Sequence, residues 1–129
     1  MKTRLYLSTI CLLSVSVFLL WAKFEVTRNF TSVSVIEDAD TYLFTATYKA
    51  DKARRVYNYI NTSIRPVQLG NSENDYVDVT TVLSDKTQFY VKESSGKVKI
   101  KFDKWKNSRA SYIRVKRMCD GIKAILAAK

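Results

Sequence analysis

The sequence predicts a small α+β domain: a mainly antiparallel five-stranded sheet with two helices packed on one of its faces. Two observations point to this class. Five short segments place apolar and polar residues at period two, and two longer segments carry apolar residues at three- and four-residue spacing. In chain order the elements are β-β-α-β-β-β-α, and the short connections between strands favour antiparallel neighbours. The sheet face opposite the helices is therefore expected to be open.

An apolar segment precedes this domain. Lys2 and Arg4 are followed by an uncharged, mostly apolar run over residues 5–22, a pattern typical of a secretory signal. Ala22 suits a cleavage site, whereas Leu20 is large for the other small position, and the run approaches the ~18 residues that span a bilayer. Residues 1–22 are thus a signal peptide or a retained signal-anchor helix. Residues 23–129 are expected to form a single extracytoplasmic domain, periplasmic or extracellular, either free or anchored to the inner membrane.

The first strands and the first helix follow from changes in period. Residues 32–36 and 41–48 alternate β-branched or aromatic residues with polar ones and form a predicted hairpin. From Ala50 the apolar residues recur at helical spacing, and Pro66 disfavours helical geometry at Arg65, so the helix ends before it. Residues 66–75 are a loop by composition, the longest in the chain.

Three strands are predicted at 76–83, 88–93 and 97–102. Turns at 84–87 and 94–96 separate them, and Gly96 is free to adopt positive φ in the second turn. The last strand alternates most clearly. It carries Val98, Ile100 and Phe102 on one face and three lysines on the other.

The final helix is predicted from about Ser108, its N-cap, to Ala127. Its apolar stripe includes Cys119, which is therefore expected to be a buried structural thiol. Gly121 costs about 1 kcal/mol relative to Ala inside a helix. Close packing against the sheet is the expected reason for it.

The composition excludes several catalytic classes. The chain has no histidine, so Ser-His and Cys-His arrangements cannot form. The pairs Asp38/Asp40 and Asp75/Asp78 fall in predicted turns, where Asp is favoured for backbone reasons, and they lack the ligand density of a calcium loop. We expect no catalytic residues, no metal site and no cofactor.

Charge is the most informative functional signal. Residues 23–129 carry a net charge of +8, and this excess comes from the last third of the chain. Residues 23–85 hold 7 basic and 9 acidic groups, whereas residues 86–129 hold 13 basic and 3 acidic groups. Such a concentration of cations attracts anionic partners.

A partner-binding surface is expected from these cations, together with one tyrosine on the same strand face as Lys92. Its members are Lys92, Lys97, Lys99, Lys101, Lys104, Lys106, Arg109, Arg114, Arg117 and Tyr90. The expected partner is an anionic surface (lipid headgroups, lipopolysaccharide or an acidic wall polymer) or an acidic protein. Nucleic acid ranks lower because the expected compartment lies outside the cytoplasm. A second interpretation stays open: lysines on a solvent-facing strand also protect sheets against edge-to-edge aggregation.

The preferred hypothesis is a non-enzymatic exported binding or accessory domain that uses one continuous cationic surface. The alternatives are a small exported enzyme or enzyme inhibitor acting through the 66–75 loop, and an assembly component tethered to the membrane through residues 5–22. Asn29 and Asn61 begin N-glycosylation acceptor patterns, which matter only in a eukaryotic host.

Overall fold

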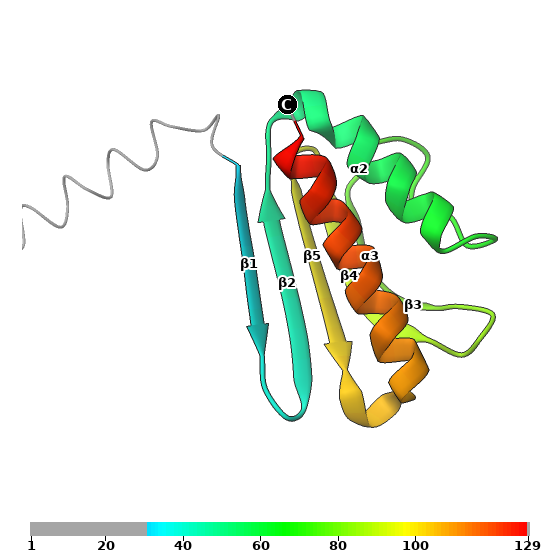
Figure 1. The fold of residues 1–129 in the computed structure, drawn as a ribbon. Helices are drawn as coiled ribbons and strands as arrows, with labels where there is room; N and C mark the ends of the chain where they lie inside the picture. The colour runs from blue at the N-terminus through cyan, green and yellow to red at the C-terminus, as the bar shows by residue number, and fades with distance from the viewer. Residues whose placement is uncertain (1–30, 129) are drawn as a thin grey trace, which may run out of the picture.

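The computed structural model describes residues 31–128, and the expectations for residues 1–22 and for Asn29 lie outside them. The predicted fold class and element order are confirmed: a five-stranded antiparallel sheet and two helices form an α+β domain (Figure 1). The elements are β1 (Ser32–Glu37), β2 (Thr41–Thr47), α2 (Ala50–Ser63), β3 (Val77–Val82), β4 (Gln88–Ser94), β5 (Lys97–Asp103), the 3₁₀ turn η1 (Lys104–Lys106) and α3 (Arg109–Ala127).

The last strand in sequence lies in the middle of the sheet. The strand order is β1-β2-β5-β4-β3, so β5 pairs with β2 on one side and β4 on the other. The β1–β2 and β3–β4 hairpins form the two outer parts of the sheet. The strand with the clearest alternation is therefore the central strand of the sheet.

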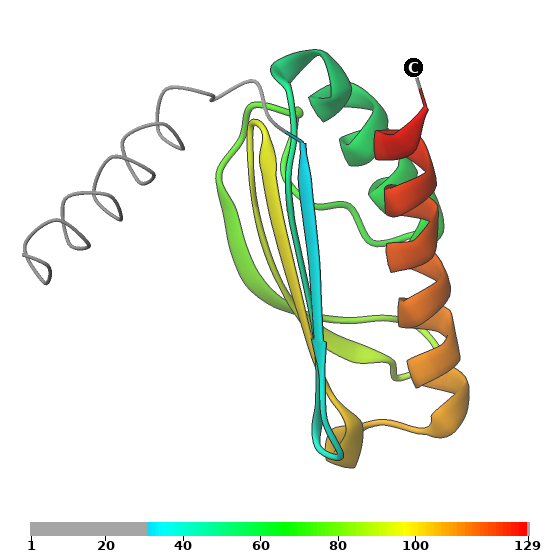
Figure 2. The same ribbon diagram turned by 60° about the vertical axis from the view of Figure 1, so that its left-hand side comes forward.

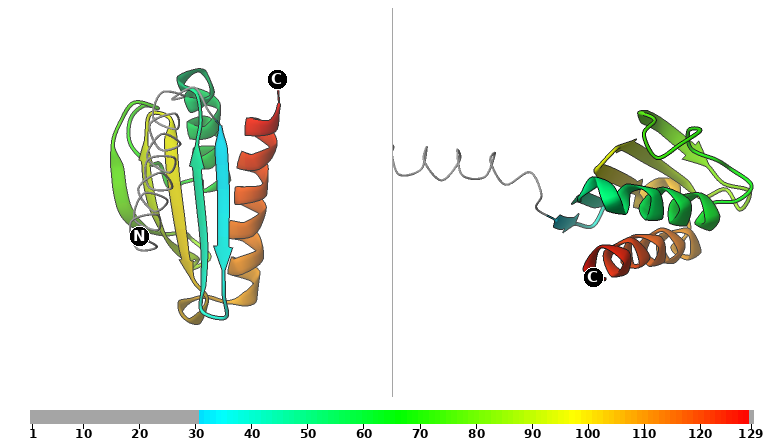
Figure 3. Two further views of the ribbon diagram at one scale, coloured as in Figure 1. Left: turned by 90° about the vertical axis from the view of Figure 1, so that its left-hand side faces the viewer. Right: turned by 90° about the horizontal axis from the view of Figure 1, so that it is seen from above.

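The core lies between the sheet and the helices, which pack side by side over one face (Figures 2 and 3). The three inner strands β2, β4 and β5 send alternate side chains into this layer, as the period-two pattern predicts. The buried side chains include Phe44, Val91, Val98, Ile100 and Phe102 from the strands, Val56 and Ile60 from α2, and Val115, Cys119 and Ile122 from α3. The expected burial of Cys119 is confirmed.

The helices leave part of the outer strands uncovered. Val33 and Val35 pair with Ala46 and Phe44 and so point toward the helix side, yet they are 39% and 40% exposed. Val79 on β3 is likewise exposed, although it lies on the inward side of its strand. All six residues of β1 are exposed to solvent.

Gly121 serves the contact between the helices, which corrects the expectation that it packs against the sheet. A Cβ atom at this position would lie 1.8 Å from the Tyr59 hydroxyl oxygen on α2. The missing side chain lets Tyr59 lie directly against α3.

Two turn and cap predictions are also confirmed. Gly96 has a φ of 85° in the β4–β5 turn, and its carbonyl accepts a hydrogen bond from the Tyr48 N–H (2.9 Å). Ser108 caps α3 by accepting from the Ser111 N–H (3.1 Å). Among residues 31–128 we find no helix with the length and apolar character needed to cross a membrane.

Candidate functional site

The lysines of β5 stand on the face of the sheet that the helices do not cover. Val98, Ile100 and Phe102 are fully buried toward the helices, so the alternating residues Lys97, Lys99 and Lys101 point the other way. Lys97 and Lys101 are exposed and Lys99 is half-buried. The three side chains form a column along the centre of the sheet, which we call the lysine column.

Residues of β4 extend the lysine column sideways. Lys92 is the direct register partner of Lys99, and Tyr90 is the partner of Lys101. Like charges directly opposite each other on neighbouring strands destabilise a sheet. Among residues 31–128, neither Lys92 nor any member of the lysine column forms an ion pair with an acid.

The strands bring two carboxylates to this face, and both are engaged elsewhere. Asp78 is the register partner of Lys92, but it accepts hydrogen bonds from the hydroxyls of Tyr90 (2.7 Å) and Tyr76 (3.3 Å). The first of these bonds raises the pKa of Tyr90 above its ordinary value. Asp103 accepts from the backbone N–H of Trp105 (2.9 Å) at the start of η1.

The ammonium group of Lys92 lies 5.9 Å from the centre of the Tyr76 ring, a weak cation–π contact. Tyr90 is the one tyrosine of the expected surface, and it positions Asp78. Tyr76 is not among the expected residues, and it contacts both Asp78 and Lys92. No local sequence pattern predicts this cluster of Tyr76, Asp78, Tyr90 and Lys92. The four side chains come together only when β3 pairs with β4.

Lys104 and Lys106 continue the chain beyond β5, where Lys104 has a structural role. Its ammonium group pairs with Glu37 (3.1 Å) and donates to the Asp38 carbonyl (2.5 Å), which ties η1 to the β1–β2 turn. The hydroxyl of Tyr112 also donates to Glu37, and this bond, followed by the one from Lys104, lowers the pKa of that carboxyl. Lys106 is exposed.

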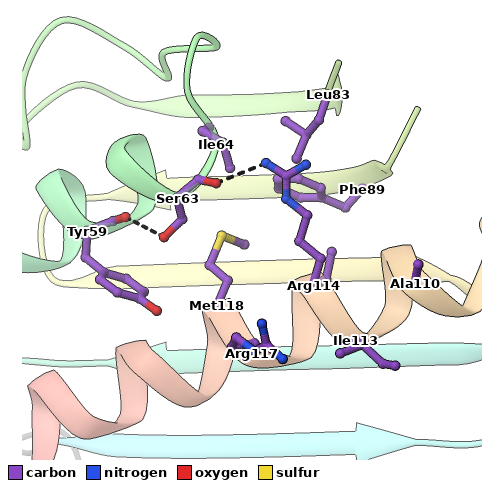
Figure 4. Close-up of a pocket in the computed structure, with 11 residues that line it drawn as sticks. Tyr59, Ser63, Ile64, Leu83, Phe89, Ala110, Ile113, Arg114, Arg117 and Met118 are labelled. Atoms are coloured by element: carbon purple, nitrogen blue, oxygen red, sulfur yellow. Dashed lines mark hydrogen bonds between the residues drawn. The ribbon is translucent and has the colours of Figure 1, made fainter. Parts of the chain in front are cut away.

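Arg109, Arg114 and Arg117 lie on α3, in the layer on the other side of the sheet. The guanidinium of Arg114 pairs with Asp85 (2.8 Å) and donates to the Ser63 carbonyl at the end of α2 (3.2 Å; Figure 4). Hydrogen bonds from Thr87 and Arg114 lower the pKa of Asp85 to about 2. Arg114 therefore joins α3, α2 and the β3–β4 turn.

A groove of about 300 Å³ opens beside Arg114, between α2, α3 and the ends of β3 and β4 (Figure 4). Its lining is largely apolar, with Phe89, Leu83 and Met118 among its members. The exposed Arg117 also lines it, and this guanidinium makes no ion pair within the described part of the chain.

The expectation of one continuous cationic surface is therefore wrong. The sheet itself divides the ten expected residues: Tyr90, Lys92 and the lysine column on its open face, Lys104 and Lys106 at one end, and the three arginines on the helix layer. The distribution of charges along the sequence does not predict this separation, because the separation depends on the direction in which each side chain points.

Of the carboxylates weighed as catalytic or metal-binding pairs, Asp38 and Asp75 hold turns together, whereas Asp78 lies on β3 and not in the predicted turn. Asp38 accepts from the N–H groups of Asp40 and Thr41 (both 2.8 Å), and Asp75 accepts from the Asn71 N–H (2.6 Å). The 66–75 loop borders a hollow of about 530 Å³ whose described lining carries no carboxylate. Over residues 31–128 no three ligating side chains gather into a group that could hold a metal ion.

The same loop is fixed by Asn61. Its side-chain oxygen accepts from the Leu69 N–H (2.7 Å), and its side-chain nitrogen donates to the Tyr57 carbonyl (3.0 Å). The amide nitrogen that an attached sugar would modify is thus already hydrogen-bonded within α2, and the oxygen of the same amide holds the loop.

Sequence reasoning missed one buried ionisable residue, Glu93. The alternation along β4 that places Phe89 and Val91 inward also places Glu93 inward, so the signal was present. Glu93 is 3% exposed, and burial raises its pKa to about 7.

Comparisons of the chain with models of known protein families, with curated proteins and with solved structures found no match. Inference about function therefore depends on the geometry of the surface itself.

Proposed function

We propose that the chain is a non-enzymatic, exported binding or accessory domain that holds an anionic partner on the open face of its sheet. The observation that carries this proposal is the position of the lysine column. Three cations stand side by side on the central strand, with Lys92 beside Lys99, and without an acid partner among residues 31–128.

The protective role of lysines against aggregation does not account for this arrangement. Charged residues guard a sheet where backbone groups are unpaired, which is at its edges. β5 has a neighbour on both sides, whereas the exposed edge strand β1 carries no charge over residues 32–36. The cations lie where edge protection is not needed.

The types of residue favour attraction without a shaped pocket. A lysine ammonium is a hydrated point charge, whereas arginine recognises phosphate or carboxylate with two parallel hydrogen bonds. The four basic side chains that the described strands place on this face are all lysines. Export, which would bring this face to lipid headgroups, acidic wall polymers or acidic proteins, is proposed from the pattern of residues 1–22 alone.

The test compares the two faces of the domain. The full chain, reconstituted in phosphatidylcholine nanodiscs, is titrated with three anionic probes: polyglutamate, long-chain polyphosphate and phosphatidylglycerol vesicles, over a range of NaCl concentrations. We expect at least one probe to bind with an affinity that falls as salt rises. Lys99→Glu with Lys101→Glu should weaken that binding by about tenfold or more, because lost cations reduce counterion release.

The matched control is Arg55→Glu with Arg117→Glu, which makes the same change in net charge at exposed residues of the helices. This control should change affinity by less than about threefold. Binding that does not depend on salt, an equal loss in both variants, or binding of none of the probes would contradict the proposal.

The enzyme or inhibitor alternative at the 66–75 loop has weaker support. The loop's carboxylates serve local structure, since Glu73 pairs with Arg54 (3.3 Å) and Asp75 accepts from Asn71. The tethered-component alternative differs from the proposal only in the fate of residues 5–22, and mass analysis of the mature N-terminus distinguishes them.

A further inference from the structure

We infer that the occupant of the open face is a linear phosphate-bearing polymer lying along β5, which deepens the proposed function and rests on it. Side chains on one face of a strand repeat every ~6.6 Å, so the lysine column spans about 13 Å from Lys97 to Lys101. Its cations follow one line, with Lys92 as the only addition among the described strand residues on this face.

Lys92 and Lys99 carry like charges at directly opposite positions of neighbouring strands, which is a cost in the free protein. An anionic group placed between the two ammonium groups removes that repulsion. A ligand should therefore gain more binding free energy beside Lys92 and Lys99 than beside the other lysines. The position of the pair at the middle lysine of the column means that a chain binding there reaches Lys97 and Lys101 on either side.

Neighbouring side chains add hydrogen-bond donors beside the column. Thr47 is the register partner of Lys97, and Thr45 is the partner of Lys99. In the next strand Ser32 and Ser34 pair with these two threonines. The column is therefore bordered on one side by a field of hydroxyls, which donate to the oxygens of an anion.

The distribution of acids argues against a lipid bilayer as the occupant. A bilayer presents headgroups over its whole area, so a docked face would bring Asp78 and Asp103 against like charge. A chain that follows β5 from Lys97 to Lys101 stays two strands away from Asp78, with Lys92 between them, and leaves the column before Asp103.

The balance of donors and acceptors argues against an extended acidic polypeptide. A lysine ammonium is donor-only, and the two carboxylates of the face already accept hydrogen bonds. The backbone N–H groups of a peptide laid on the column would find only the hydroxyls of the bordering serines and threonines as acceptors, whereas phosphate oxygens, which only accept, match the lysine and hydroxyl donors directly.

The experiment uses the full chain in phosphatidylcholine nanodiscs and measures binding of long-chain polyphosphate, tripolyphosphate and polyglutamate, with the first and last matched in charge. We expect long-chain polyphosphate to bind at least about tenfold more tightly than tripolyphosphate at equal total phosphate, because only the long chain reaches all three lysines. Polyglutamate should bind more weakly than long-chain polyphosphate.

The variants identify the residues that the polymer contacts. Lys97→Gln with Lys99→Gln and Lys101→Gln should reduce the slope of log affinity against log salt by about two to three, roughly one for each lost phosphate contact. The matched triple Arg55→Gln, Arg109→Gln and Arg117→Gln should change the slope by less than about one. Thr45→Val with Thr47→Val should weaken binding with the slope unchanged, since it removes donors and no charge.

Three outcomes would overturn the inference and leave the proposed function standing: equal affinity for tripolyphosphate, tighter binding of polyglutamate, or competition by phosphatidylglycerol vesicles at the same phosphate concentration. Absence of binding to every anion would overturn both. Circular dichroism of each variant, showing an unchanged fold, keeps a loss of binding interpretable.

Discussion

Glu93 is a carboxylic acid in the interior of the domain, on β4 between the sheet and the helices. One of its oxygens is buried and has no hydrogen-bond partner within the described part of the chain. Burial raises the pKa of Glu93 from 4.5 to about 7. The pKa of the equally buried Tyr48 is raised first by its own burial and then by repulsion from the Glu93 carboxylate. A buried, unpaired acid makes folding sensitive to pH.

The direction of that sensitivity follows from the two pKa values. Between pH 4.5 and 7 the folded chain keeps a proton that the unfolded chain has lost, so the stabilisation present below pH 4.5 disappears as pH rises through 7. Glu93→Gln should remove this loss and raise the free energy of unfolding at pH 8 by up to about 3 kcal/mol. Urea denaturation at pH 4.5 and pH 8 measures it, with Glu73→Gln as control. The raised pKa of Glu93 would be contradicted if the stability of the wild-type protein rose from pH 5 to pH 7 and Glu93→Gln did not change that trend.

Gly121 provides a second test at the scale of one residue. Replacing Gly by Ala inside a helix ordinarily stabilises it by up to about 1 kcal/mol. Here the new Cβ meets the hydroxyl and ring of Tyr59, so Gly121→Ala should instead destabilise the domain by about 1 kcal/mol or more.

A double-mutant cycle separates the two effects on Gly121. In a Tyr59→Ala background the contact is gone, and Gly121→Ala should then stabilise the protein as helix propensity predicts. Thermal unfolding of the four proteins gives the coupling energy. Additive changes in stability would show that Tyr59 does not restrict this position.

At the scale of elements, the pair of strands β4 and β5 combines a stability cost with the proposed binding role. Lys99→Gln removes the repulsion with Lys92 and should stabilise the fold by about 0.5 kcal/mol at low salt, with a smaller gain at high salt. Lys97→Gln is the matched control, because Lys97 faces Ser94 across the same two strands and should give no gain. Denaturation at two salt concentrations measures both, and equal effects of the two substitutions would exclude the like-charge contact as the cause.

Local pattern was sufficient to locate the elements but not to order them in space. Period-two alternation found all five strands, and helical spacing found both helices, since each pattern reflects one buried face. The central place of β5 depends on pairing between residues far apart in the chain, such as Thr45 with Lys99. No short segment records that pairing.

At the scale of the whole molecule, the same limitation explains the incorrect single surface. The sequence predicted correctly that Lys97, Lys99 and Lys101 share a face and that Tyr90 shares one with Lys92. It did not show that Arg114 would be used to join three elements or that Lys104 would pair with Glu37. Those contacts require the final packing of α3 and η1 against residues up to 75 positions away.

The central place of β5 also determines how durable the open face is. Strands at the border of a sheet separate first in local opening, whereas an inner strand is released only with global unfolding. Amide hydrogens along β5 should therefore be among the slowest in the molecule to exchange with solvent. Fraying of β1 or β3 would leave the backbone under the three ammonium groups in place, so that the spacing of these charges persists for as long as the domain stays folded.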